Sequence, residues 1–194
     1  MMVENKDNKT TPELCISRRR ILKLGLLAAA SCLIPHKALA SAADLFSNKR
    51  ALSFHNLHTE EKLDAVYWQD GEYLPEGLNE INILLRDHYT EEVTVIDEKL
   101  LDLLFTIQTE LKSKEPFQII SAYRSPETNA HLREQGRGVA RNSMHMLGKA
   151  VDFRIPGYDL TDVWSAASEL QAGGVGYYAK SNFVHVDVGD VRYW

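Results

Sequence analysis

Two stretches of the chain alternate strictly between apolar and polar side chains. In residues 149–155 every second side chain from Val151 onwards is apolar, and Asp152 occupies a polar position between them. Residues 182–188 repeat this pattern, with His185 and Asp187 at the polar positions. A period of two is typical of a half-buried strand whose apolar face packs on the core. If the two strands are neighbours in one sheet, Asp152 and His185 lie on the same face.

The remaining elements follow from apolar periodicity and turn signals. Further strands are predicted at residues 51–58, 62–68, 117–121 and 175–178. Helices are predicted at residues 78–85, 97–111 and 160–170, where apolar side chains recur every three or four positions, and from Pro126 onwards. This order of elements predicts an α+β fold, in which an antiparallel β-sheet has helices packed on one side.

Polar residues mark where several of these helices begin. Asp97 and Ser125 are predicted N-caps, because their side chains can accept a hydrogen bond from the first turn. Thr161 is a candidate cap for the helix at residues 160–170. Arg86 and Asp87 are expected on the exposed side of the first helix.

Residues 1–40 have the pattern of an export signal. Consecutive arginines at 18–20 directly precede the apolar run of residues 24–34, and an Ala-Leu-Ala cleavage site ends at Ala40. This is typical of a twin-arginine signal peptide, so we expect the twin-arginine translocase as a partner during export. The apolar run has about a dozen residues, fewer than the roughly 20 that span a bilayer, so no stable membrane anchor is expected. A lipoprotein signal ending at Cys32 is a weaker alternative.

Composition and charge narrow the class of protein. Residues 41–49 are predicted to be a linker and residues 50–194 a single domain, and 44% hydrophobic residues are enough to give it a core. Both cysteines, Cys15 and Cys32, precede the cleavage site, so the mature chain offers no thiol chemistry.

After residue 40 there are 15 basic and 24 acidic residues, and no basic patch suits nucleic acid. We expect a monomer.

The candidate chemistry centres on residues 143–152. This block places His145 and Asp152 seven positions apart, with Gly148 between them to let the backbone turn. Together with His185 they form a His/Asp/His set, and zinc hydrolases favour three nitrogen or oxygen ligands with a fourth position left to water. A single histidine near a strand is more often a hydrogen-bonded structural residue. The combined pattern favours a metal site.

The block and four other motifs resemble the zinc peptidases that group lysostaphin, the D-Ala-D-Ala peptidases and the hedgehog fold. The other motifs are Asn56-Leu57-His58-Thr59, Ser121-Ala122-Tyr123-Arg124-Ser125, Arg137-Gly138-Val139-Ala140 and Ala172-Gly173-Gly174-Val175-Gly176-Tyr177-Tyr178. The resemblance implies that His145, Asp152 and His185 bind Zn²⁺. It also implies hydrolysis of peptide cross-links between peptidoglycan stems, in the periplasm of the bacterial envelope. Whether D,D or L,D links are cleaved stays open.

The general base is not evident from the sequence. Relatives in this group often place Glu or His two or three residues before the last ligand, where this chain has Phe183 and Asn182. Asp187 is the nearby substitute, and its alternative role is to orient the imidazole of His185. Because the usual base is missing, a non-catalytic peptidoglycan-binding module with the same fold is the alternative function.

Three further residues are candidates for contacting substrate. Arg124 follows the strand at 117–121, where a cation can hold a substrate carboxylate or stabilise an oxyanion, although it can equally be structural. Ser143 can hydrogen-bond either its own turn or the substrate, and Tyr178 can line the cleft. His58 and His131 have no metal-compatible neighbours in sequence and are left out of the site.

Overall fold

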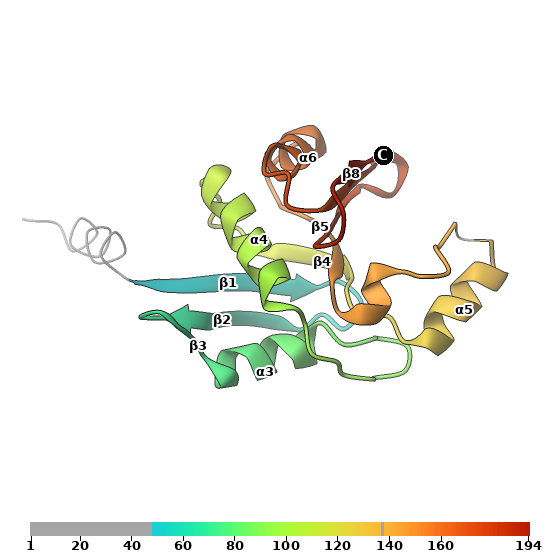
Figure 1. Ribbon diagram of the computed structural model, residues 1–194, viewed down its shortest axis with the longest axis horizontal. Helices are drawn as coiled ribbons and strands as arrows, with labels where there is room; N and C mark the ends of the chain where they lie inside the picture. The colour runs from blue at the N-terminus through green and yellow to red at the C-terminus, as the bar shows by residue number, and fades with distance from the viewer. Residues whose placement is uncertain (1–47, 137) are drawn as a thin grey trace, which may run out of the picture. The chain divides into compact units, whose positions relative to one another are not determined.

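The computed structural model describes residues 48–136 and 138–194 (Figure 1). The predicted signal peptide, its cleavage site, both cysteines and most of the predicted linker lie outside the described residues. The order of the described strands and helices agrees with an α+β fold.

One eight-stranded sheet forms the centre of the domain, in the order β3-β2-β1-β4-β5-β7-β6-β8. Its strands are β1 (Lys49–Asn56), β2 (Lys62–Gln69), β3 (Glu72–Tyr73), β4 (Phe117–Ser121), β5 (Ala150–Arg154), β6 (Gly174–Tyr178), β7 (Phe183–Asp187) and β8 (Arg192–Tyr193). Most neighbours are antiparallel, as the sequence predicts. The β1–β4 and β6–β8 pairs are parallel, and the sheet is therefore mixed.

Three helices share a single hydrophobic core with one face of the sheet. They are α3 (Pro75–Leu84), α4 (Glu98–Glu110) and α6 (Leu160–Glu169), which contribute Ile81, Leu104 and Val163, among others, to the same cluster as the apolar strand positions. The short helix α5 (Pro126–Glu134) contributes no buried residue to this cluster. It lies away from α4 and α6, at the right of Figure 1.

The alternating strands place their polar side chains on the sheet face away from this core. Val151 and Phe153 belong to the core, whereas Asp152 between them points to the other face. Strands β5 and β7 are direct neighbours, and Asp152 pairs with His185 across them. The two strands are therefore neighbours, which is the condition under which Asp152 and His185 share one face.

The helix ends match the sequence at two positions and differ at two others. Asp97 accepts a hydrogen bond from Lys99 N, and Ser125 accepts one from Thr128 N, as predicted for N-caps. Thr161 is not a cap, because α6 begins at Leu160 and the capping position is Asp159. Asp87 is not on an exposed helix face. Helix α3 ends at Leu84, three residues before Asp87, and the Asp87 side chain is buried.

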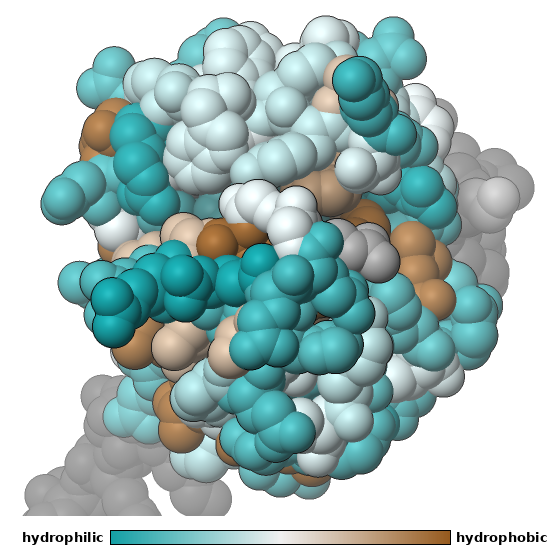
Figure 2. Space-filling model, turned by 90° about the vertical axis from the view of Figure 1, so that its right-hand side faces the viewer, coloured by the Kyte–Doolittle hydropathy of each residue, from teal (hydrophilic) through white to brown (hydrophobic). Residues whose placement is uncertain are grey.

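The surface seen in Figure 2 is mainly hydrophilic, and its apolar atoms form small patches separated by polar side chains. Scattered apolar atoms of this kind are normal on a protein surface and need no partner to cover them. Within the part of the chain that the structure describes, no helix is both long and apolar enough to cross a bilayer.

Asp87 connects the loop after α3 to the start of α5. Its carboxylate accepts hydrogen bonds from Ser125 N at 2.8 Å and from Tyr89 N at 2.9 Å. Burial alone would raise the pKa of Asp87, but these bonds and one from the Thr128 hydroxyl outweigh it and lower the pKa to about 2.

We therefore expect Asp87→Asn to lower the free energy of unfolding by about 2 kcal/mol at neutral pH. Because the folded-state pKa is depressed, this contribution is present above the ordinary pKa and disappears as the pH falls toward 2. Urea unfolding of both proteins across this range measures it, with Asp64→Asn, an exposed carboxylate, as control. A difference between wild type and Asp87→Asn that stays constant down to low pH would contradict the assignment.

Candidate metal centre

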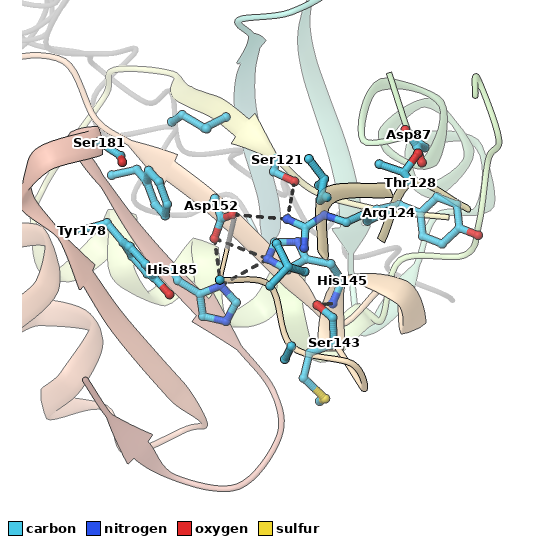
Figure 3. A pocket seen from close by; sticks show the side chains of 18 of the residues that line it. Asp87, Ser121, Arg124, Thr128, Ser143, His145, Asp152, Tyr178, Ser181 and His185 are labelled. Atoms are coloured by element: carbon cyan, nitrogen blue, oxygen red, sulfur yellow. Dashed lines mark hydrogen bonds and ion pairs between the residues drawn. The ribbon is translucent and has the colours of Figure 1, made fainter. Parts of the chain in front are cut away.

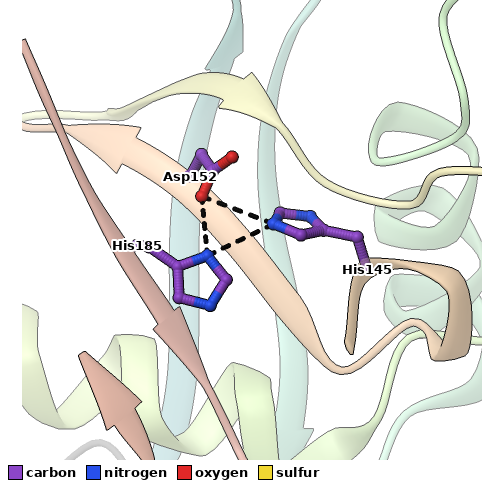
Figure 4. A group of neighbouring side chains, drawn as sticks. All are labelled: His145, Asp152 and His185. Carbon is purple, nitrogen blue, oxygen red and sulfur yellow. Dashed lines mark hydrogen bonds and ion pairs between the residues drawn. The ribbon is translucent and has the colours of Figure 1, made fainter. Parts of the chain in front are cut away.

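Three side chains from separate elements converge on the polar face of the sheet (Figure 4). His145 comes from the short helix η2 (Met144–Leu147), Asp152 from β5 and His185 from β7. His185 Nδ1 lies 2.8 Å from Asp152 Oδ1, and His145 Nε2 lies 3.4 Å from the same oxygen and 3.2 Å from His185 Nδ1. All three residues are buried. Among the described residues this is the one group of three such side chains that can hold a metal ion.

The turn that carries His145 is fixed on both sides. Ser143 caps η2, its hydroxyl accepting a hydrogen bond from His145 N at 3.3 Å. Gly148 ends the helix in the left-handed conformation, with φ of 65°. A Cβ on Gly148 would overlap the carbonyl oxygen of Val95, so both the conformation and the space require glycine here.

Each imidazole presents one nitrogen to the cluster because the other nitrogen is engaged elsewhere. His145 Nδ1 donates to the carbonyl of Ala122 at 2.6 Å, and His185 Nε2 donates to Asp187 Oδ2 at 2.9 Å. In the neutral rings this leaves lone pairs on His145 Nε2 and His185 Nδ1, both beside Asp152 Oδ1. Two imidazole nitrogens, each oriented by a contact on the far side of its ring, and one carboxylate oxygen fit a metal ion with an open position.

The charges in the cluster stabilise one another. Burial alone would raise the pKa of Asp152, but the neighbouring His145 and hydrogen bonding to both imidazoles hold this pKa below its ordinary value. Burial alone would lower the pKa of His185, and here the carboxylates of Asp152 and Asp187 outweigh it and raise the pKa. The carboxylate of Asp152 is therefore ionised, as a metal ligand must be.

Asp187 lies behind His185 and is completely buried. Besides the His185 ring, its carboxylate accepts from Gly174 N at 3.2 Å, from Gly189 N at 2.9 Å and from the Arg192 guanidinium at 2.6 and 3.2 Å. Burial would raise the pKa of Asp187, but the bonds from His185, Gly189 and Arg192 lower it. This carboxylate is firmly held and stays ionised.

Arg124 lies on the opposite side of the cluster from Tyr178 in Figure 3. Its guanidinium donates to Ser121 Oγ at 3.1 Å and lies 3.9 Å from Asp152 Oδ2. Burial lowers the pKa of Arg124, partly offset by the charge of Asp152. The guanidinium still carries its charge and has donors left for a ligand.

These residues line a cleft of about 610 Å³, which contains all three candidate ligands and also Arg124, Ser143 and Tyr178. Tyr178 stacks on Phe183, with ring centroids 4.5 Å apart, and its hydroxyl accepts from the Trp194 indole at 2.8 Å. Ser143 combines the two roles considered for it, because it caps the His145 turn and also borders the cleft.

Several residues that line the cleft were not assigned to the site from the sequence. His58, set aside because of its neighbours in sequence, stacks on His88 at the cleft wall, with ring centroids 3.8 Å apart. Arg192 and Trp194 also line the cleft; Arg192 begins β8, a strand of two residues, and Trp194 directly follows it. Two residues cannot display a periodicity, so the sequence does not predict β8.

Comparison with known proteins agrees with this geometry. A family described as peptidoglycan L,D-endopeptidase MepK matches residues 45–194. The chain is 40% identical over 178 residues to the peptidoglycan L,D-endopeptidase MepK of Escherichia coli (strain K12), covering 92% of this chain and 97% of the relative. It is 41% identical over 179 residues to a probable peptidoglycan L,D-endopeptidase MepK of Haemophilus influenzae (strain ATCC 51907 / DSM 11121 / KW20 / Rd), covering 92% and 95%.

These matches confirm the resemblance inferred from the motifs, and with it the prediction of a peptidoglycan endopeptidase. They favour an enzyme over the non-catalytic binding module that the missing upstream base left open. The cluster of His145, Asp152 and His185 provides the donor atoms that a metallopeptidase requires. The chain therefore belongs to the peptidoglycan L,D-endopeptidase MepK family, which is a family of metal-dependent peptidases.

Proposed function

We propose that this enzyme uses a zinc ion, bound by His145, Asp152 and His185, to cleave L,D cross-links between peptidoglycan stems. The observation that carries the proposal is the donor set itself. Three oriented nitrogen and oxygen atoms face one point in a cleft of about 610 Å³. The names of the relatives support L,D rather than D,D links.

Zinc is the metal ion that this donor set suits best. Two imidazole nitrogens and one carboxylate oxygen are a common ligand set of catalytic zinc sites, which leave a further position open. When bound, zinc supplies Lewis-acid polarisation of the scissile carbonyl and activation of a water molecule. The protein orients the two histidine ligands, His145 through Ala122 and Ser143 and His185 through Asp187.

Arg124 is the group we assign to the developing negative charge. It is the cation of the cleft beside Asp152, and a desolvated guanidinium binds carboxylates and oxyanions through directed donors. It either holds a carboxylate of the stem peptide or stabilises the tetrahedral oxyanion. Tyr178 and Phe183 form a stacked aromatic wall along which a peptide stem can pack.

For Asp187 the geometry favours orienting His185 over acting as general base. A base must reach the attacking water within about 2.6–3.2 Å. The Asp187 carboxylate instead lies behind the His185 ring, and both of its oxygens already accept hydrogen bonds from protein donors. Its position is that of the carboxylates which fix the tautomer of metal-binding histidines.

We further propose that the enzyme acts in the periplasm as a monomer, without a stable membrane anchor and with no nucleic acid partner. The arginines at 18–20 before an apolar run support export by the twin-arginine translocase, with cleavage after Ala40. The peptidoglycan named for the relatives supports action in the envelope.

Removing any one ligand should remove the metal. In His145→Ala, Asp152→Ala or His185→Ala the remaining two donors leave the site incomplete, and we expect both zinc and hydrolysis of purified sacculi to be lost. Metal analysis and release of soluble peptides measure this, with the exposed His131→Ala as the control. A ligand variant that keeps one zinc per chain would overturn the assignment.

The choice of bond can be tested on the products. We expect incubation with sacculi to convert L,D-cross-linked muropeptide dimers into monomers, to leave D,D-cross-linked dimers intact, and to stop when a chelator removes the metal. Mass spectrometry of muropeptides before and after digestion gives the answer. Consumption of the D,D dimers would contradict the proposed specificity.

The two possible roles of Asp187, orienting His185 or acting as general base, can be distinguished by the effect of its substitution on zinc binding. If Asp187 orients His185, Asp187→Asn should weaken zinc binding by about 10–100-fold, and activity should return when zinc is added. A general base would give the opposite outcome, with normal zinc affinity and turnover reduced by roughly 10²–10⁴-fold. Zinc titration alongside turnover distinguishes the two.

A further inference from the structure

The segment after β7 folds back beside the metal cluster and joins the sheet at β6. Arg192 pairs with Gly174 and Tyr193 with Val175 in parallel register. Trp194 continues the pairing, because Trp194 N donates to Val175 O at 3.3 Å and Tyr177 N donates to Trp194 O at 2.8 Å. The backbone of this segment is thereby fixed, and its side chains at 192 and 194 line the cleft.

Arg192 and His185 share one buried carboxylate. The guanidinium donates to Asp187 Oδ2 at 2.6 Å and to Oδ1 at 3.2 Å, while His185 Nε2 donates to Oδ2 at 2.9 Å. Such a two-point arginine contact fixes the plane of a carboxylate as well as its position. Since the His185 ring is hydrogen-bonded to that carboxylate, Arg192 restricts how the ring can rotate.

Trp194 restricts the same ring from another side. Its indole ring lies 5.2 Å from the His185 ring and 5.1 Å from the Arg192 guanidinium carbon, measured to ring centroids. Its Nε1 donates to the Tyr178 hydroxyl. Gly176, which pairs with His185 across β6 and β7, makes room for the indole, since a Cβ there would lie 2.6 Å from the Trp194 ring.

We propose that Arg192 and Trp194 are positioning residues that hold the His185 imidazole with Nδ1 directed at the metal ion. This inference rests on metal binding by His145, Asp152 and His185, which is part of the proposed function. In this proposal the His185 ring is held in place by Arg192 and Trp194 as well as by its hydrogen bond to Asp187. A ring held in place loses less conformational freedom on binding the metal ion, so removing the support should weaken binding.

The competing explanation is that β8 only completes the edge of the sheet. Tyr193 provides the matched control, because it lies between Arg192 and Trp194 in the chain. Its hydroxyl donates to the carbonyl of Ser168, at the end of α6, and it does not line the cleft. Tyr193→Phe therefore removes a contact of β8 without touching the supports of His185.

The test is the zinc dissociation constant of the full-length chain, measured by competition with a chromophoric chelator. Arg192→Gln and Trp194→Ala should each weaken zinc binding by about 10–100-fold, the usual effect of losing a group that orients a ligand. Trp194→Phe keeps an aromatic ring against His185 and should recover most of the affinity. Tyr193→Phe should bind zinc as the unaltered chain does.

Unfolding of the zinc-free proteins is measured in parallel. If Arg192→Gln does not fold, Arg192→Lys replaces it, because lysine keeps the charge but not the two-point contact, and an intermediate loss of zinc affinity is expected. Unchanged affinity in the folded Arg192 and Trp194 variants, or an equal loss in Tyr193→Phe, would overturn this inference alone. A chain that binds no zinc at all would overturn the proposed function and this inference with it.

Discussion

The pairing of β5 with β7 is the constraint on which the proposed metal site depends. Val151 faces Val186 and Asp152 faces His185 across these strands. A shift of one residue would move every side chain to the other face, placing Asp152 in the core and a valine in the cleft. Burial of the valines therefore stabilises the same register that brings the two proposed ligands together. The hydrophobic core holds the geometry of a site on the opposite face of the sheet.

His145 does not belong to a strand, and its position depends on the end of β4. The carbonyl of Ala122 accepts from the His145 ring, and Arg124 N donates to the carbonyl of His145 at 3.2 Å. The chain directly after β4 thus holds both the side chain and the backbone of this ligand. The same connection sets Arg124 beside Asp152. One short segment therefore places a proposed metal ligand and a cation of the cleft together.

The sequence was informative where function follows a local pattern. Alternation predicted the faces of Asp152 and His185, and the block around Gly148 indicated His145. Contacts between distant segments have no such pattern. The hydrogen bond from Ser125 N to Asp87 joins residues 38 positions apart, so Asp87 resembled an exposed helix residue. The parallel pairing of β1 with β4 also depends on the path of the long connection between them. The periodicity of side chains within a strand carries no information about that path.

The two histidines are anchored in different ways, and the difference bears on the charge of the site. His145 donates to a neutral carbonyl, whereas His185 donates to the carboxylate of Asp187. The negative charge of Asp187 is paired with the guanidinium of Arg192, and the negative charge of Asp152 lies near the guanidinium of Arg124. The two carboxylates and two guanidiniums balance, so a bound divalent ion leaves the centre with net positive charge. A positive centre in a largely buried cleft stabilises an oxyanion more strongly than one in open water, because the surrounding dielectric is lower.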